Sequence, residues 1–248
     1  MLSSEHEYDK MAASEVQHWW YTTLHCQVYS TIKNRFASRN VDILDAGCGT
    51  GGLMQYLAKR GYAQVKGFDV SDYAITHCRS KGLDVLQASL TDVAGVYAGQ
   101  QFDVITCCDA LYFLQTEHQK EVLVQLYRML RPGGLLILNL PALELFSGIH
   151  DISVGIGKRY HHRMLPALLP ASSYSYRYWP VCLSPFIAIA RYRQRLRMAS
   201  GGFQISSDVT QPGAVINSVL RLALRLEITL PAIIPFGSSL FVVLGKQH

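Results

Sequence analysis

The sequence predicts an α/β fold: a doubly wound, mostly parallel sheet of seven strands, with a helical cap inserted before the last strand. Short apolar runs alternate with amphipathic helical stretches between residues 41 and 140. A glycine-rich segment follows the first apolar run, at the place where such sheets bind ligands. The 248 residues, 49% of them hydrophobic and 17% charged, are enough for one large globular domain.

The order of the elements follows from these patterns. Apolar runs predict five buried strands, at 41–47, 65–70, 83–88, 102–108 and 135–140. Helices are expected after the glycine loop, between a capping Ser71 and Gly82, and over 121–130, where Val122, Leu123, Leu126, Tyr127 and Leu130 share one face. The tetrapeptide 131–134, Arg-Pro-Gly-Gly, is expected to turn the chain into the fifth strand.

The C-terminal part of the chain completes the sheet. Residues 174–181 alternate like a strand, and residues 239–246 predict another, so we expect an antiparallel pair at an edge. Two helical stretches, 185–198 and 215–227, lie between them and form the predicted cap.

Composition limits the cellular context. The N-terminus is polar, with no apolar run behind it, so no secretory signal is expected. No apolar run approaches the length of a transmembrane helix. The six cysteines form no C-x-x-C pair and have no metal-ligand spacing, which favours reduced thiols and no metal site. The sequence therefore predicts a cytoplasmic protein.

The net charge of +5 is unevenly distributed. Residues 1–150 carry 12 basic and 15 acidic residues, whereas residues 151–200 carry eight basic residues and one acid. The basic segment favours an acidic partner, such as a phosphate, a carboxylate or an anionic membrane surface.

The glycine loop, "ILDAGCGTGG", fits two cofactor signatures. Gly47, Gly49 and Gly52 match the dinucleotide pattern G-x-G-x-x-G, and Asp45 with the glycines matches D-x-G-x-G-x-G, a loop that holds S-adenosylmethionine (SAM). A carboxylate before the first glycine would disfavour a pyrophosphate, but it suits a ligand that carries an ammonium and a sulfonium. The electrostatics therefore favour SAM over NAD. Asp69, which ends the second strand, can accept hydrogen bonds from both ribose hydroxyls in either case, and a simple turn role is its alternative.

The motifs in this order resemble those of class I SAM-dependent methyltransferases. They are "VDILDAGCGTGG", "VKGFDVS", "FDVITCCDALYFL" and "LRPGGLLILNLP", which together cover residues 41–141. "QHWWY", "HDISVGIGKRY" and "PFGSSLFVVLGK" look like a bacterial subgroup related to the methyltransferase-11 type. The resemblance implies one Rossmann-like domain, with a helical lid over 1–40, a SAM-binding core over 41–141 and an acceptor-side segment over 142–248.

The resemblance also implies the cofactor residues. Ser89 and Leu90 follow the third strand, where the family contacts the adenine, although the family often has an acid at the Ser89 position. The SAM-binding residues expected from the matching motifs are Asp45, Ala46, Gly47, Cys48, Gly49, Gly51, Asp69, Val70, Ser89, Leu90 and Cys108.

The acceptor side is less clearly marked. Methylation of a hydroxyl usually gains from a general base, whereas a carboxylate acceptor needs none. Family members often place a His where this chain has Phe113, so the best candidates for a base are His150 and Asp151 after the fifth strand. The alternative is that both fix a loop by hydrogen bonding. Asp109 is interpreted as shaping the acceptor side or a turn.

Several other side chains are assigned to the acceptor. Lys158, Arg159 and Tyr160 could hold an acidic group, and Tyr112 and Trp20 complete the predicted set. Trp20 belongs to the aromatic cluster 18–21, which either closes as a lid or packs its helix onto the domain. Four alternate arginines, Arg191, Arg193, Arg195 and Arg197, could contact an anionic membrane or a lipid phosphate. However, alternate positions do not form one helical stripe, which favours a solvated cap helix.

These observations predict a SAM-dependent methyltransferase that acts on a small-molecule or lipid/sugar-linked acceptor. The acceptor is expected to carry an acidic group and to be methylated at oxygen. The protein itself is expected either free in the cytoplasm or peripheral to the inner membrane face. A SAM-binding protein without transfer activity, serving as a sensor or assembly partner, is the alternative. A nicotinamide oxidoreductase is disfavoured by Asp45. A nucleic-acid methyltransferase is disfavoured because the chain lacks an N-P-P-Y-like tetrapeptide. The acceptor's identity and the oligomeric state do not follow from the sequence.

Overall fold

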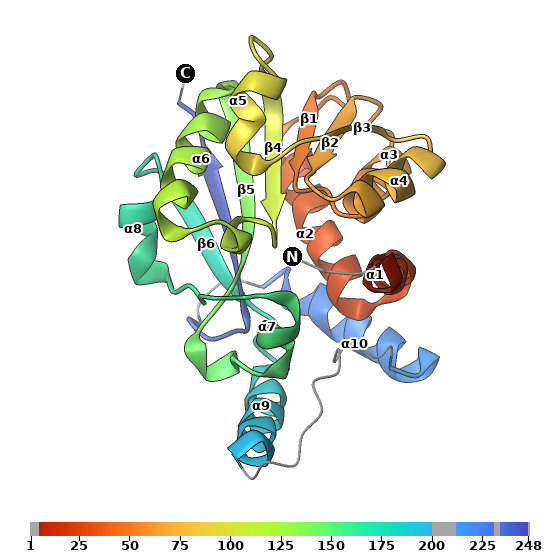
Figure 1. Cartoon of the computed structure of the whole chain (residues 1–248), viewed down its shortest axis with the longest axis vertical. Helices are drawn as coiled ribbons and strands as arrows, with labels where there is room; N and C mark the ends of the chain where they lie inside the picture. The colour runs from red at the N-terminus through yellow and green to blue at the C-terminus, as the bar shows by residue number, and fades with distance from the viewer. Residues whose placement is uncertain (1–4, 200–211, 231–233, 248) are drawn as a thin grey trace.

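A seven-stranded sheet with helices on both faces forms the body of the protein (Figure 1). The computed structural model describes residues 5–199, 212–230 and 234–247. The strands lie in the order β3-β2-β1-β4-β5-β7-β6. Their bounds are β1 Ile43–Ala46, β2 Val65–Asp69, β3 Asp84–Gln87, β4 Phe102–Cys108, β5 Leu130–Pro141, β6 Tyr174–Trp179 and β7 Ser239–Gly245.

The sheet is doubly wound, which confirms the predicted fold class. Strands β1 to β5 pair in parallel, and β7 pairs antiparallel with both β5 and β6. From β1 the chain proceeds outward through β2 to β3, and then returns to β4 on the other side of β1. The strand order therefore reverses between β1 and β4, and the crevice at their carboxyl ends is where such a sheet binds ligands.

Ten α-helices and four short 3₁₀ turns are present in the described residues. The predicted cap is present: the Ser71 side chain accepts from the backbone N of Ala74 at the start of α4. A second cap was not predicted: His18 Nδ1 accepts from the backbone N of Trp20 at the start of α2. The helices are α1 Glu5–Gln17, α2 Trp19–Arg35, α3 Gly52–Ala58, α4 Asp72–Ser80, α5 Val93–Val96, α6 Thr116–Arg128, α7 Ile149–Val154, α8 Leu165–Leu168, α9 Ser184–Ala199 and α10 Ala214–Glu227, and the 3₁₀ turns are η1 Leu90–Asp92, η2 Leu111–Phe113, η3 Glu144–Phe146 and η4 His162–Met164.

Strand β5, inside the sheet between β4 and β7, packs against two separate apolar layers. Leu136, Leu138 and Leu140 lie in the layer that includes the apolar face of α6, whereas Leu135 and Ile137 lie in the layer beneath α2 and α3. Successive side chains of a strand point to opposite faces, so a strand covered on both faces has to be apolar throughout. This explains why "LLILNL" is an unbroken hydrophobic run apart from Asn139.

The start of the fifth strand differs from the prediction, since Leu130, expected on the face of the preceding helix, is the first residue of β5. The tetrapeptide 131–134 lies within β5 and does not precede it, because Leu130 already pairs with Phe102 before a register shift in the β4–β5 ladder. Arg131 holds this start in place, since its guanidinium contacts Asp42 at 2.5 Å and Asp103 at 2.7 Å.

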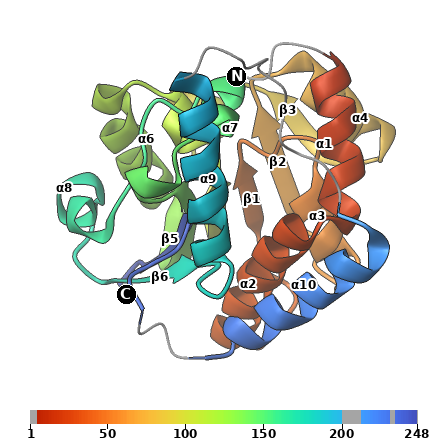
Figure 2. The ribbon, with the colours of Figure 1, turned by 90° about the horizontal axis from the view of Figure 1, so that it is seen from below.

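The two cap helices occupy different sides of the molecule. They lie between β6 and β7 in the chain, as predicted. Helix α9 contacts α7 and η3, whereas α10 runs along the outer side of α2 (Figure 2). Among the described residues, no helix is long and apolar enough to span a membrane.

Candidate active site

The glycine loop after β1 packs closely against two neighbouring strand ends. The backbone N–H groups of Gly47 and Cys48 both donate to the carbonyl oxygen of Phe68, at 2.9 Å. Gly47 has φ +77°, and a Cβ there would lie 2.4 Å from the Cβ of Ala110. Only glycine fits this position, because the chain just after β4 lies in contact with the loop.

Asp69 connects the loops that follow β1 and β2. Its Oδ2 accepts from the backbone N of Gly49 at 3.0 Å, and its Oδ1 accepts from the backbone N of Ser71 at 2.9 Å. Burial raises the pKa of Asp69, and these N–H donors partly offset that rise. Each carboxylate oxygen can accept a second hydrogen bond, so the group remains able to bind a pair of ribose hydroxyls.

Two further acids are buried beside the loop. Asp45 Oδ1 accepts from Thr106 Oγ1 at 2.6 Å, and burial raises the pKa of Asp45 to about 6, with the charge of Asp69 adding to the rise. Glu15 extends from α1, where its Oε2 accepts from the Thr50 hydroxyl and from the backbone N of Gly52. Burial raises the pKa of Glu15 to about 7.

These carboxyl groups suit a cationic ligand. A sulfonium or an ammonium placed near them would favour their charged forms, whereas a pyrophosphate would be repelled. This set of carboxylates therefore fits SAM, with Asp69 available for the ribose hydroxyls, and it does not fit the pyrophosphate of a dinucleotide.

Beyond the loop, Asp109 lies at the carboxyl end of β4 in a three-residue polar chain. Asn139 Nδ2 donates to Asp109 Oδ2 at 2.8 Å, and Trp179 Nε1 donates to Asn139 Oδ1 at 2.9 Å. Because the indole N–H fixes the carbonyl side of the Asn139 amide, its NH₂ group must face Asp109. Burial raises the pKa of Asp109 to about 7, and Asn139 and the charge of Arg159 limit the rise.

Aromatic side chains surround this polar chain. Trp20 stacks on Trp179 with ring centroids 5.3 Å apart, and Tyr112 packs against Phe113 at 4.5 Å. Burial raises the pKa values of Tyr21 and Tyr112, and the charge of Asp109 adds to the rise. Both phenols therefore lie near Asp109 and stay neutral.

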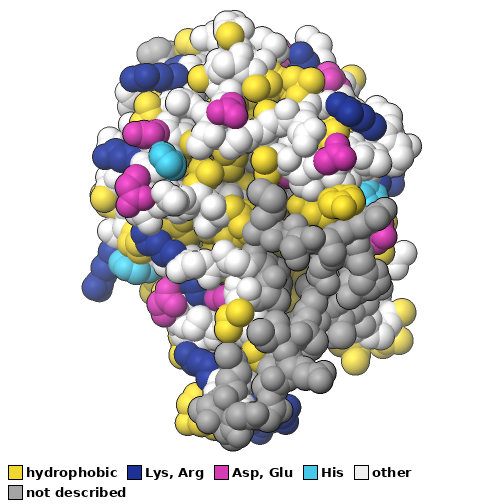
Figure 3. Space-filling view, in the orientation of Figure 1, with side chains coloured by type: hydrophobic (Ala, Val, Ile, Leu, Met, Phe, Trp, Pro, Cys, Tyr) yellow, Lys and Arg dark blue, Asp and Glu magenta, His cyan; other side chains and the backbone are white. Residues whose placement is uncertain are grey.

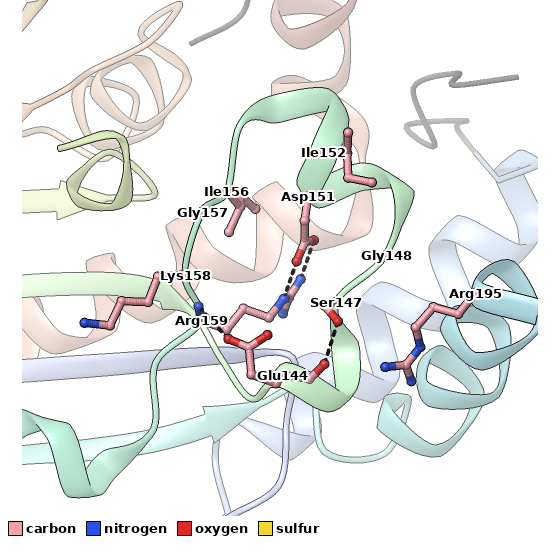
Figure 4. Close-up of a pocket in the computed structure, with 10 residues that line it drawn as sticks. All are labelled: Glu144, Ser147, Gly148, Asp151, Ile152, Ile156, Gly157, Lys158, Arg159 and Arg195. Carbon is pink, nitrogen blue, oxygen red and sulfur yellow. Dashed lines mark hydrogen bonds and ion pairs between the residues drawn. The ribbon is translucent and has the colours of Figure 1, made fainter. Parts of the chain in front are cut away.

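A pocket of about 300 Å³ lies between α7, α9 and η3 (Figure 4). Beside it, Arg159 makes a two-pronged ion pair with Asp151: Nε donates to Oδ2 at 2.6 Å and Nη2 donates to Oδ1 at 2.7 Å. Arg159 Nη1 also donates to the carbonyl oxygens of Ala142 and Ser238. This guanidinium thus ties α7 to the end of β5 and to the segment before β7.

Comparison with known proteins agrees with this geometry. The sequence model of a methyltransferase domain family matches residues 43–134. An O-methyltransferase of ubiquinone biosynthesis from Methylococcus capsulatus is 30% identical over 172 residues, which are 62% of this chain and 68% of that protein. The chain belongs to the class I SAM-dependent methyltransferases.

Other relatives match a smaller part of their own length. The methyltransferase-named protein YqeM of Bacillus subtilis is 32% identical over 103 residues, and the match covers 39% of this chain and 41% of YqeM. A SAM-dependent methyltransferase of Archaeoglobus fulgidus has the same fold, with a TM-score of 0.55 and 16% identity over 90% of this chain and 94% of that one. Membership of this family supports SAM as the cofactor, as the sequence predicted.

The residues predicted to bind SAM lie along the carboxyl ends of β1 to β4. Asp45 and Ala46 end β1, the glycines form the loop, and Cys108 ends β4 opposite Asn139. Val70 is exposed after β2. Ser89 caps η1 by accepting from the backbone N of Thr91, and the Leu90 side chain points into the core. Their individual roles in binding stay predictions.

The predicted acceptor residues divide into two groups. Asp109, Tyr112 and Trp20 come together around the Asn139–Trp179 pair. Tyr160 is buried in the main core, where its hydroxyl donates to Gln119 Oε1 at 2.9 Å, and Lys158 lines the pocket and points away from the Asp151–Arg159 pair (Figure 4). The His150 side chain lies outside the described residues.

Asp151 and Arg159, two of the predicted site residues, are bonded to each other, and this bears on their predicted roles as a base and as an acceptor-binding residue. Both carboxylate oxygens of Asp151 accept from Arg159, and Arg159 also donates to two backbone carbonyl oxygens, so the two side chains are held in place by contacts within the protein. Both assignments stay predictions.

Three residues of the site were not predicted from the sequence: Glu15, Asn139 and Trp179. Glu15 carries no motif, because a single acid in a polar helix does not indicate its tertiary contact. Asn139 did have a signal: it is the one polar residue in an otherwise apolar strand, and a buried amide requires hydrogen-bond partners.

The ribose role of Asp69 gives a direct prediction. Changing Asp69 to Ala is expected to weaken binding of S-adenosylhomocysteine by about tenfold or more, because two charge-assisted hydrogen bonds to the ribose are lost. Isothermal titration calorimetry measures the affinity. Asp72→Ala, which removes an exposed acid three residues later, is the matched control and should leave the affinity unchanged. Equal affinities of the two variants would show that Asp69 is a turn residue.

Proposed function

We propose that this methyltransferase transfers the methyl group of SAM to a hydroxyl oxygen of a small-molecule or lipid/sugar-linked acceptor, with Asp109 taking up the hydroxyl proton. The observation that carries the proposal is the position of Asp109: it directly follows β4, next to the Ala110 that contacts the glycine loop, and Asn139 orients its carboxylate.

The chemistry divides between the cofactor and the chain. SAM supplies a methyl group activated by the adjacent sulfonium, which leaves binding, orientation and proton transfer to the protein. Asp45, Asp69 and Glu15 would hold the cationic cofactor at the glycine loop. Asp109 Oδ2 is bonded to Asn139, and Oδ1 has no hydrogen bond within the described part of the chain, so Oδ1 is the atom that would take the proton. A base with a pKa near 7 is well matched to this task at neutral pH.

The surroundings of Asp109 support an acceptor with an aromatic or other apolar part. Trp20, Tyr21 and Tyr112 offer ring faces there, and their burial would exclude water from the transfer. The names of relatives agree with an oxygen acceptor, since the Methylococcus capsulatus protein and a Pseudomonas entomophila protein, 33% identical over 143 residues, are ubiquinone biosynthesis O-methyltransferases.

Helix α1 and the pocket beside Lys158 also have roles in the proposed reaction. Helix α1 would act as a lid over SAM, because Glu15 is its contact with the glycine loop and Tyr8 stacks on Tyr73 of α4. The pocket beside Lys158 would receive an acidic group of the acceptor, which the basic segment 151–200 would attract.

The experiment uses three benzene derivatives that differ in the accepting group. Purified protein is incubated with tritiated-methyl SAM and catechol, aniline or benzoate, and with a bacterial lipid extract, and the extracted label is counted. Label in catechol supports the proposal, and label in the lipid extract supports it where the labelled lipid carries a methyl ether and not a methylated amine. Label only in aniline would overturn the oxygen assignment. Label only in benzoate would place the methyl group on a carboxylate oxygen, which needs no base, and would contradict the role of Asp109. Label in none of them would contradict a hydroxyl acceptor of these classes. His150→Ala in the same assay tests whether His150 is needed as the base.

A further inference from the structure

Helix α10 exposes an apolar stripe along its outer side. Val215, Val219, Leu222 and Leu226 recur at the three- and four-residue spacing of one helical face, and their exposed fractions are 78%, 61%, 62% and 61%. Leu230, just past the helix, is also 61% exposed. Figure 3 shows hydrophobic side chains at the lower right edge of the molecule, where Figure 1 places α10.

The other side of α10 is held firmly against α2. Leu224 is fully buried, Asn217 Oδ1 accepts from the backbone N of Trp19 at 2.8 Å, and Asn217 Nδ2 donates to the carbonyl oxygen of Gln17 at 2.7 Å. These contacts fix the rotation of the helix about its axis. The apolar stripe therefore faces outward because the inner face is already packed.

The charges beside the stripe are positive. Arg221 and Arg225 each precede a stripe leucine by one residue, which places them about 100° around the helix from it. The single acid of α10, Glu227, accepts from the backbone N–H groups of Val181 and Cys182, at 2.7 and 2.8 Å. Helix α9 also combines exposed apolar and basic side chains: Phe186 and Ile189 are exposed on it, and so is Arg193.

We propose that α10 is a membrane-docking helix that lies in the surface of an anionic bilayer, with its leucines among the acyl chains and its arginines at the phosphates. An interfacial helix has these two features: one strongly apolar face and flanking basic residues. The 14 residues of α10 extend about 21 Å, well short of the hydrocarbon thickness.

A second copy of the chain fits this surface less well. If two copies paired antiparallel through the stripe, the arginines of both helices would lie on the same side of the seam. The one carboxylate of α10, Glu227, would not balance them, because it is bonded to Val181 and Cys182 of its own chain. Anionic lipid phosphates supply the missing charge. The proposal does not depend on the acceptor, although α10 is bonded to Trp19, next to the Trp20 that stacks on Trp179.

The test is co-sedimentation of the full chain with lipid vesicles. The protein is expected to bind vesicles of phosphatidylcholine containing about one third phosphatidylglycerol, and to bind pure phosphatidylcholine about tenfold more weakly. About 1 M salt should reduce binding to the anionic vesicles, because it screens the arginine–phosphate attraction. Arg221→Gln with Arg225→Gln should remove the preference for anionic lipid.

The leucines are tested by a matched pair of double variants. Leu222→Ser with Leu226→Ser is expected to lower binding to anionic vesicles about tenfold or more. Leu86→Ser with Leu145→Ser changes two exposed leucines elsewhere and should leave binding unchanged. Circular dichroism and the melting temperature should be the same for both variants, since all four side chains are exposed.

Three outcomes would overturn the proposal. They are equal binding by the two double variants, no binding of the wild-type chain to anionic vesicles, and a wild-type dimer without vesicle binding that the Leu222/Leu226 variant converts to a monomer. The last outcome would assign the stripe to a second copy of the chain.

Discussion

Replacing Asp109 by asparagine is expected to lower the rate of methyl transfer to a hydroxyl acceptor by about 10²- to 10⁴-fold. An amide in this place can still accept the hydrogen bond from Asn139 Nδ2, so the geometry is retained, but it cannot take a proton. Affinity for S-adenosylhomocysteine should stay the same, because Asp69 and the glycine loop are untouched. Single-turnover transfer of a tritiated methyl group and calorimetry measure the two quantities.

The pH dependence of the wild-type rate tests the same role. Burial raises the pKa of Asp109 from its ordinary value of 3.8 to about 7, so below that pH the carboxyl group is protonated and cannot act as a base. The rate should therefore rise as pH increases through about 7 and then level off, and this step should be absent in Asp109→Asn. The aromatic neighbours Tyr21 and Tyr112 do not interfere, because burial raises their pKa values above the ordinary range.

Stability separates loss of a base from loss of structure. A carboxyl group whose pKa is raised by folding binds its proton more tightly in the folded state, so its contribution to stability falls as pH rises from about 4 to about 7. The neutral Asn variant escapes this loss and should be at least as stable as the wild-type chain at pH 8. Asp103→Asn, near the opposite end of β4, is the matched control and should keep the wild-type rate. An Asp109→Asn variant with wild-type activity would disprove the role of the base.

The sequence was sufficient for the parallel core of the sheet because its signals are local. Each strand from β1 to β5 is a short apolar run, and the helices α3, α4 and α6 show their own periodicity or cap. The four-residue α5 between β3 and β4 was not predicted. Asp45 and Asp69 could be predicted for the same reason, since a strand end and a glycine loop place them at the carboxyl edge of the sheet.

The remaining parts of the site depend on contacts between distant segments. Glu15 lies 35 residues from Thr50 in the chain, and no local pattern shows which acid of α1 meets the loop. The chain from Trp179 through Asn139 to Asp109 requires both the register of β4 against β5 and the position of β6 beside β7. Likewise, the exposed stripe of α10 has the same periodicity as a buried face, and only the packing against α2 shows which side is outward.

Changing Asp151 to Ala is expected to lower the free energy of unfolding by about 3–5 kcal/mol, because it leaves a buried guanidinium without its carboxylate. The side chains of Arg159 and Asp151 are only 6% and 9% exposed, so solvent does little to compensate for the lost charge. The carbonyl oxygens of Ala142 and Ser238 remain as partners of Arg159, but neither carries a full charge. Thermal unfolding followed by circular dichroism should show a decrease in melting temperature of about 10 °C.

Two further variants identify the cause of this loss. Glu144→Ala removes an exposed acceptor of the Arg159 backbone N–H and should cost only about 1 kcal/mol. The double change Asp151→Leu with Arg159→Met removes both charges and should recover part of the stability, since a buried ion pair can be replaced by apolar side chains at little net cost. If Asp151→Ala instead unfolds no more readily than Glu144→Ala, the pair is not a structural tie. In that case Arg159 is free to leave it, and the prediction that Arg159 binds an acidic acceptor gains support.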